Sequence, residues 1–162
     1  MSKMDEFKFW IATIRALEAA TGPDRSIDVD VAILLGAADE RQRGRPHPHC
    51  IDGTPIPHFT KSVEEVEARI RRDIPDGIWE VQTEPFIDAQ IVDMAGAREG
   101  IEPEPWGSAF LSINDFGETV RRMERPPANV AIALTLALLR GMEEVLGFDG
   151  IEDDEVSSIA RH

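Results

Sequence analysis

The chain is short of basic residues and has a single cysteine. Of its 162 residues, 17 are lysine or arginine and 31 are aspartate or glutamate, which gives a formal net charge of −14. A field of this sign repels phosphate backbones, so direct binding to nucleic acid is disfavoured. The lone Cys50 excludes an intramolecular disulfide framework and fits a reducing compartment.

Long apolar runs and targeting signals are also lacking. The longest apolar run, residues 128–139, is interrupted by Asn129 and Thr135 and falls short of the about 20 residues that a bilayer requires. Acids occupy the N-terminus, where a signal peptide would be basic. We therefore expect a cytoplasmic protein that does not associate with membranes. The sequence contains no glycine-rich phosphate loop, no GxSxG motif and no paired CxxC motif.

What the chain does contain is enough apolar material for one core. Hydrophobic residues make up 42% of the sequence and charged residues 30%, so a packed domain is favoured over wholesale disorder. The length suits one domain, which we place at residues 1–148. The acidic segment 149–162 is expected to be a frayed tail.

Apolar residues recur at helical spacing in several segments. The spacing predicts helices over residues 5–20 and 27–35, and a third helix that begins after Thr60 or Ser62 with Glu65 completing a capping box. The last helix, from Val130 to Leu139, is apolar nearly all round and is therefore expected to be central and buried. A short helix over residues 119–123 is expected before it.

Between the third and last helices the apolar period changes to two. Residues 78–82, 87–91 and 108–113 alternate between apolar and polar, and turn signals separate them. The simplest pairing is an antiparallel meander. The predicted fold is therefore α+β, with a small antiparallel three-stranded sheet packed against helices in the order α-α-loop-α-β-β-β-α.

Residues 37–60 are predicted to form a long loop, because its prolines hold the preceding residues extended. Arg41, Arg43 and Arg45 alternate in this loop, so an extended backbone places all three on one side. Guanidinium groups suit phosphate and carboxylate partners, which makes this arginine loop a candidate anion site for a nucleotide. The alternative is pairing with the protein's own acids.

The same loop carries side chains that zinc prefers, namely His47, His49, Cys50 and His58. Their spacing matches no standard zinc pattern, and solvated histidines in a proline-rich loop are the simpler interpretation. Catalysis by a Cys50 thiolate with a neighbouring histidine as base is a further hypothesis, set against burial of the cysteine as a small apolar residue.

Two acids in the second predicted helix are candidates for metal or acid–base chemistry. Asp28 and Asp30 are two residues apart and point in different directions on a helix. We interpret them as solvated surface acids, and no cofactor is predicted.

The strand region is strongly acidic. Residues 76–104 contain eight acids and one base, Arg98. Alternation predicts that one face of the sheet packs on the last helix, and its members are Trp79, Val81, Ile87, Ala89 and Ile91.

The opposite face of the predicted sheet carries Glu80, Gln82, Glu84, Asp88 and Gln90. A row of carboxylates there favours solubility, and it also fits a cationic groove on another protein. Two free sheet edges leave homodimerisation through a strand open.

Several packing and capping segments resemble a known family. They are residues 17–25, the helix that ends at Gly36, residues 57–66, the strand at 78–80 and residues 127–134. Together, over residues 14–146, they are similar to small phage and prophage proteins of the phage α/β/α-sandwich type. The resemblance implies a phage setting and helices on both faces of the sheet, which would cover the acid face. It implies no reaction and no catalytic residue.

Charge, missing catalytic motifs and this resemblance together predict a non-enzymatic phage or prophage accessory protein that acts by binding in the cytoplasm of an infected host cell. The most concrete form is an anti-CRISPR-like inhibitor whose acidic surface occupies a basic groove on a bacterial defence protein. Two alternatives stay open. One is a nucleotide-sequestering protein that uses the arginine loop, and the other is a metal-dependent enzyme centred on the His/Cys loop.

Overall fold

The computed structural model describes residues 2–43, 49–114 and 116–148. The elements, in chain order, are α1 (Lys3–Ala19), α2 (Arg25–Leu34), η1 (Glu40–Gln42), α3 (Val63–Asp73), β1 (Gly77–Gln82), β2 (Asp88–Asp93), η2 (Ala97–Glu99), β3 (Glu104–Ser108), β4 (Leu111–Ile113), β5 (Thr119–Arg121) and α4 (Val130–Gly141). The predicted α+β class, the antiparallel three-stranded sheet and the order of the helices around it are confirmed. The expected tail, residues 149–162, lies outside the described residues.

The sheet differs from the prediction at its third strand. The strand expected over residues 108–113 is broken: β3 ends at Ser108 and pairs with β2, whereas β4 begins at Leu111 and pairs with β5 in a separate two-stranded sheet. Ala109 and Phe110 are both buried, so the alternation fails between the two strands. The short helix expected over residues 119–123 is also wrong, because this segment pairs with β4 as strand β5.

Local capping signals place the helix starts. Ser62 accepts a hydrogen bond from the Glu65 N–H and begins α3, as one of the two expected caps. Helix α2 begins two residues earlier than predicted, because Asp24 accepts from the N–H groups of Ser26 and Ile27. The Glu65 carboxylate turns to His58 instead of closing the capping box on Ser62.

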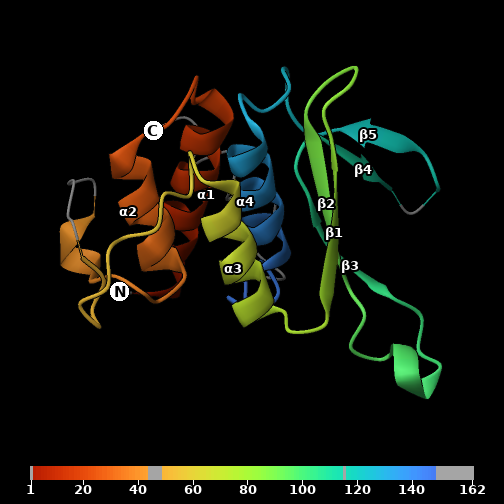
Figure 1. Ribbon diagram of the computed structural model, residues 1–162, viewed down its shortest axis with the longest axis horizontal. Helices are drawn as coiled ribbons and strands as arrows, with labels where there is room; N and C mark the ends of the chain where they lie inside the picture. Colours follow the sequence, from red (N-terminus) through yellow and green to blue (C-terminus); the bar gives the residue numbers. More distant parts are fainter. Residues whose placement is uncertain (1, 44–48, 115, 149–162) are drawn as a thin grey trace.

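Helix α4 lies at the centre of the molecule. It packs against β2 and β3 on one side and against α1 and α3 on the others, and α2 packs outside α1 (Figure 1). Every residue from Ala131 to Leu139 is buried, as the sequence predicted. None of the helices in the described part of the chain has both the length and the apolar character needed to cross a membrane.

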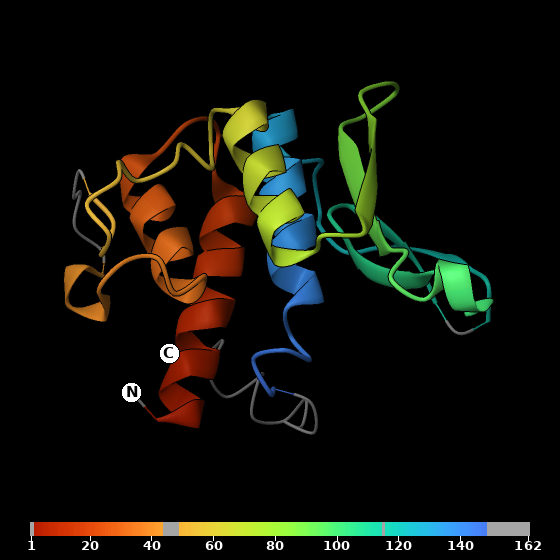
Figure 2. The same cartoon turned by 60° about the horizontal axis from the view of Figure 1, so that its bottom comes forward.

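The four α-helices of the described residues all lie on the same side of the three-stranded sheet (Figures 1 and 2). The sheet order is β1-β2-β3, so β1 and β3 are its edges. Within the described residues, the other face of the sheet has no helix against it. The second layer of helices that the resemblance implies is therefore not seen in this part of the chain.

Hydrogen bonds from neighbouring elements satisfy the ends of α4. At its start, the Asn129 side chain accepts from the Ile132 N–H and donates to the carbonyl of Thr60. At its end, the indole N–H groups of Trp10 and Trp106 donate to the carbonyls of Leu139 and Leu138, at 2.9 and 3.0 Å. The last carbonyls of a helix have no partner within it, so these bonds allow the end to be buried.

The backbones of β3 and α4 approach each other closely at two glycines. A Cβ atom on Gly107 of β3 would overlap the Ala137 carbonyl oxygen of α4. A Cβ atom on Gly141 of α4 would overlap the Trp106 ring of β3. The absence of both side chains is what lets the central helix lie against the sheet.

Replacing Gly107 with alanine should therefore destabilise the protein by about 3 kcal/mol, because the clash is with backbone that cannot rotate away. Gly22→Ala is the matched control, because no atom lies within 4 Å of a Cβ added there. Urea denaturation of both variants measures the difference. Equal unfolding midpoints for the two variants would show that β3 and α4 are not in this contact.

Candidate functional site

The face of the sheet that points away from the helices is the candidate site. In the antiparallel register, Ile78 is opposite Val92, Glu80 is opposite Gln90 and Gln82 is opposite Asp88. Side chains directly opposite each other point to the same side of a sheet. Glu80, Gln82 and Gln90 are exposed, and Ile78 is 54% exposed. We call this surface the open face, defined by Ile78, Glu80, Gln82, Gln90 and Val92.

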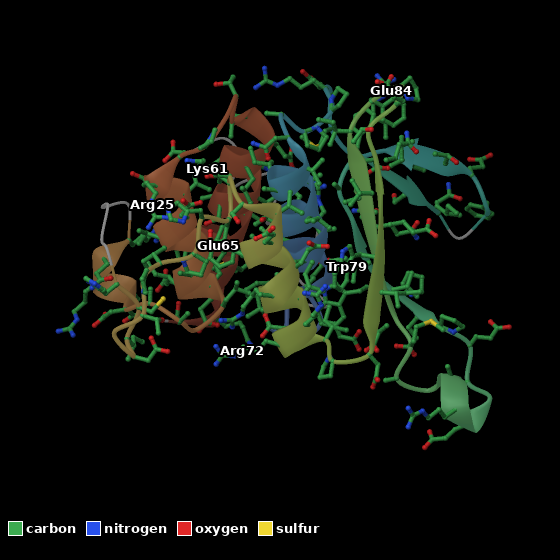
Figure 3. The ribbon with its side chains drawn as sticks, viewed as in Figure 1. Arg25, Lys61, Glu65, Arg72, Trp79 and Glu84 are labelled. Atoms are coloured by element: carbon green, nitrogen blue, oxygen red, sulfur yellow. The ribbon has the colours of Figure 1, made fainter. Side chains whose placement is uncertain are left out.

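The helix side of the same strands has a different character. Trp79 points toward α3 (Figure 3), and its indole N–H donates to the Glu67 carboxylate at 2.8 Å. The Arg71 guanidinium lies 5.2 Å from the centre of the Trp79 ring. Ala89 and Ile91 are fully covered. The two faces are therefore divided as the alternation predicted for Trp79, Ala89 and Ile91, whereas Val81, which was expected on the packed face, is 40% exposed.

Glu84 belongs to the turn between β1 and β2. It is exposed at the end of the hairpin, away from the middle of the open face (Figure 3). Its carboxylate extends the negative surface along the hairpin, but it does not lie beside Glu80 in a strand. The expected row of acids is thus shorter than the alternation suggested.

Asp88 is the residue that departs most from the expected row. It is half-buried, and its carboxylate accepts hydrogen bonds from the N–H groups of Phe110 at 2.8 Å and Leu111 at 3.4 Å. These donors lie where β3 would otherwise have continued into β4. Asp88 therefore holds the chain at the break between the two sheets instead of offering its charge to a partner.

Asp88→Ala should lower the free energy of unfolding by about 2 kcal/mol, because two backbone N–H groups lose their acceptor. Glu80→Ala on the same face removes an exposed carboxylate and should change stability by less than about 0.5 kcal/mol. Chemical denaturation of the two variants makes the comparison. A larger loss for Glu80→Ala than for Asp88→Ala would contradict these separate roles.

The arginine loop does not present three free guanidinium groups. Arg41 binds the Asp39 carboxylate through two nitrogens, with the shorter contact at 2.6 Å. This pairing is the largest cause that lowers the pKa of Asp39, to about 2. Arg43 lies over the Phe9 ring, 4.2 Å from its centre. Arg45 lies outside the described residues.

Arg41→Gln should raise the pKa of Asp39 from about 2 toward its ordinary value of 3.8, because the strongest donors to the carboxylate are removed. The Arg41 backbone N–H also bonds this carboxylate, so the rise should be partial. NMR titration of the carboxyl carbon gives both values. An Asp39 pKa already near its ordinary value in the unmodified protein would show that Arg41 is free in solution.

The proposed zinc ligands are engaged separately. The backbone of His49 forms an isolated β-bridge with Pro55, and the Cys50 thiol faces the Pro55 carbonyl at 3.8 Å. The ring of His58 lies 3.0 Å from the Glu65 carboxylate on α3. Among the described residues, no three His, Cys, Asp or Glu side chains form a group that could hold a metal ion. His47 lies outside the described residues, so the zinc hypothesis stays a prediction.

Cys50 borders a hollow of about 480 Å³ between the end of α2, the 50–57 segment and α3. Glu65 and Arg72 lie on α3 at this side of the molecule (Figure 3). Glu65 is bound to His58, and Arg69 donates to Asp73 and to the Leu35 carbonyl. Most polar groups of the hollow are therefore committed to bonds that hold the fold.

Asp28 was expected to be a solvated acid, and this expectation is wrong. It is 1% exposed, and its carboxylate accepts from both the N–H and the hydroxyl of Thr60 at 2.8 Å. Arg25 donates to its other oxygen at 2.9 Å. The hydrogen bonds of the Asp28 carboxylate thus join α2 to the segment before α3. Its spacing in α2 could not reveal this role, because Thr60 lies 32 residues further along the chain.

Comparison of the chain with known protein families, with curated proteins and with solved structures finds no match. The features that bear on function are therefore the geometry of the sheet and the distribution of charge.

Proposed function

We propose that this protein acts by binding, without catalysis, and that the open face of its sheet is the contact surface. The observation that carries the proposal is the exposure of Ile78 beside Glu80 on a sheet whose helices all lie on the other side. Exposed apolar area next to a carboxylate is a combination that interfaces use, since the apolar part supplies affinity and the charge supplies orientation.

The chemistry of the open face favours a cationic protein partner. Glu80 offers acceptor oxygens for lysine or arginine, and Gln82 and Gln90 offer both donors and acceptors. Glu84 at the hairpin end extends the negative surface. The net charge of −14 adds a long-range attraction that speeds the encounter with a positive surface.

The partner of this proposal is a protein with a basic groove that otherwise holds nucleic acid. Occupation of that groove by the open face would inhibit nucleic-acid binding by direct competition. A bacterial defence effector is the form of this partner that the resemblance to phage proteins favours. In this form the protein is an anti-defence inhibitor that works inside the infected cell.

The double variant Glu80→Lys/Glu84→Lys tests the proposal, because it reverses the charge of the surface at two exposed positions. Glu64→Lys/Glu144→Lys makes the same change in net charge at exposed positions on helix α3 and after α4. The unmodified protein and both variants are immobilised and exposed to nuclease-treated bacterial lysate at low and high salt. Retained proteins are then purified, and their affinities are measured.

The expected result is a partner that the unmodified protein and the control variant retain at low salt and the Glu80/Glu84 variant does not. Loss of two close charge pairs should weaken the purified complex by about a hundredfold. The partner should also lose bound nucleic acid when the protein is added. Equal retention by both double variants would refute the open face as the contact surface.

A further inference from the structure

A second charged surface lies away from the open face, and its sign is opposite to that of the chain. A hollow of about 700 Å³ lies between the second half of α1 and the segment that joins β5 to α4. Its charged lining residues are Arg15, Glu18, Arg122, Glu124 and Arg125. These residues could not be grouped from the sequence, because Arg15 and Arg122 are more than a hundred residues apart.

The Glu18 carboxylate at this hollow is already neutralised. The Arg140 guanidinium donates to the Glu18 carboxylate at 2.8 Å. The same guanidinium also donates to the carbonyl of Ala109. Arg140 is largely buried, and burial is the main cause that lowers its pKa. Arg125 donates to the Ala19 carbonyl at 2.7 Å, which fixes one guanidinium at the rim without neutralising it.

Arg15 and Arg122 have no such partners. Both are exposed, and neither side chain forms a hydrogen bond or ion pair with the described residues. The charge of Arg122 also acts on Arg140, where it adds to the lowering of the pKa that burial causes. Two guanidinium groups therefore face one hollow with their donors unused, next to a third positive charge.

Arginine side chains outnumber acids at this surface, although the protein as a whole is acidic. Arg15, Arg122 and Arg125 line the hollow together with Glu18 and Glu124, and Glu18 is paired with Arg140, in a chain whose net charge is −14. Repulsion between neighbouring guanidinium groups is relieved when a multivalent anion binds between them. A guanidinium group presents its donors in a fork that fits the oxygens of a phosphate.

We propose that this hollow is a binding site for the phosphate group of a small molecule, with Arg15 and Arg122 as its ligands. A small ligand is favoured over a nucleic-acid strand, because the net charge of −14 repels an extended phosphate backbone. The proposal is independent of the open face, which lies on the sheet and uses none of these residues.

Calorimetric titration with pyrophosphate tests the site. Arg122→Gln and Arg15→Gln should each weaken binding by about tenfold, because each removes a charged donor. Glu124→Gln should tighten binding by a few fold, since it removes a carboxylate from the lining. Arg98→Gln is the matched control, because Arg98 is exposed on η2 and does not line the hollow.

Thermal unfolding of each variant establishes that the fold is intact, as expected for exposed side chains. Parallel titrations with ADP and with pyrophosphate distinguish a nucleotide ligand from a simple phosphate compound. Binding of either ligand supports the proposal if the Arg15 and Arg122 variants weaken that binding. Absence of pyrophosphate and ADP binding to the unmodified protein overturns the proposal, as does an equal loss in Arg98→Gln. Tighter binding of a single-stranded oligonucleotide than of both small ligands overturns the assignment to a small molecule.

Discussion

Burial of helix α4 is the constraint on which the other features of this structure depend. A helix that is covered on every side must have its terminal backbone groups satisfied by neighbouring elements, because water cannot reach them. Trp10 from α1 and Trp106 from β3 donate to carbonyls near its end. Asn129 and Thr135 join its first half to the segment before α3. Helix α1, strand β3 and the segment before α3 therefore each contribute a polar contact to α4 as well as apolar area.

The position of α4 also decides which surface of the sheet is free. Its close approach to β3 at Gly107 places the helical layers on one side of the strands. The side chains of β1 and β2 that point the other way are left exposed, and they include both apolar and charged groups. The proposed binding surface is thus a consequence of how the core is built. It needs no pocket or metal.

Local patterns predicted most of this fold because the interactions behind them are local. The apolar stripe of α1, the all-round apolarity of α4 and the Ser62 cap can be read within one or two helical turns. The division of Trp79 and Ile91 from Glu80 and Gln90 follows from a period of two. These features require no knowledge of which distant segment lies alongside.

The features that the sequence did not reveal depend on distant partners. Asp88 accepts from Phe110 and Leu111, so the break between β3 and β4 comes from a contact across 22 residues. Asp28 is buried because Thr60 reaches it from another segment. The arginine hollow joins α1 to the residues before α4. In each case the residue type indicated a charge, but only the tertiary structure determined what that charge contacts.

One face of the sheet is packed on helices and the other is free. Thiol labelling of single cysteines on adjacent positions of β2, in a Cys50→Ser background, distinguishes the two faces. A cysteine introduced by Gln90→Cys should react at the rate of an unfolded peptide, and one introduced by Ala89→Cys should react only after unfolding. Protection of the Gln90→Cys thiol in the isolated, folded protein would contradict the claim, because it would mean that another part of the chain covers the open face.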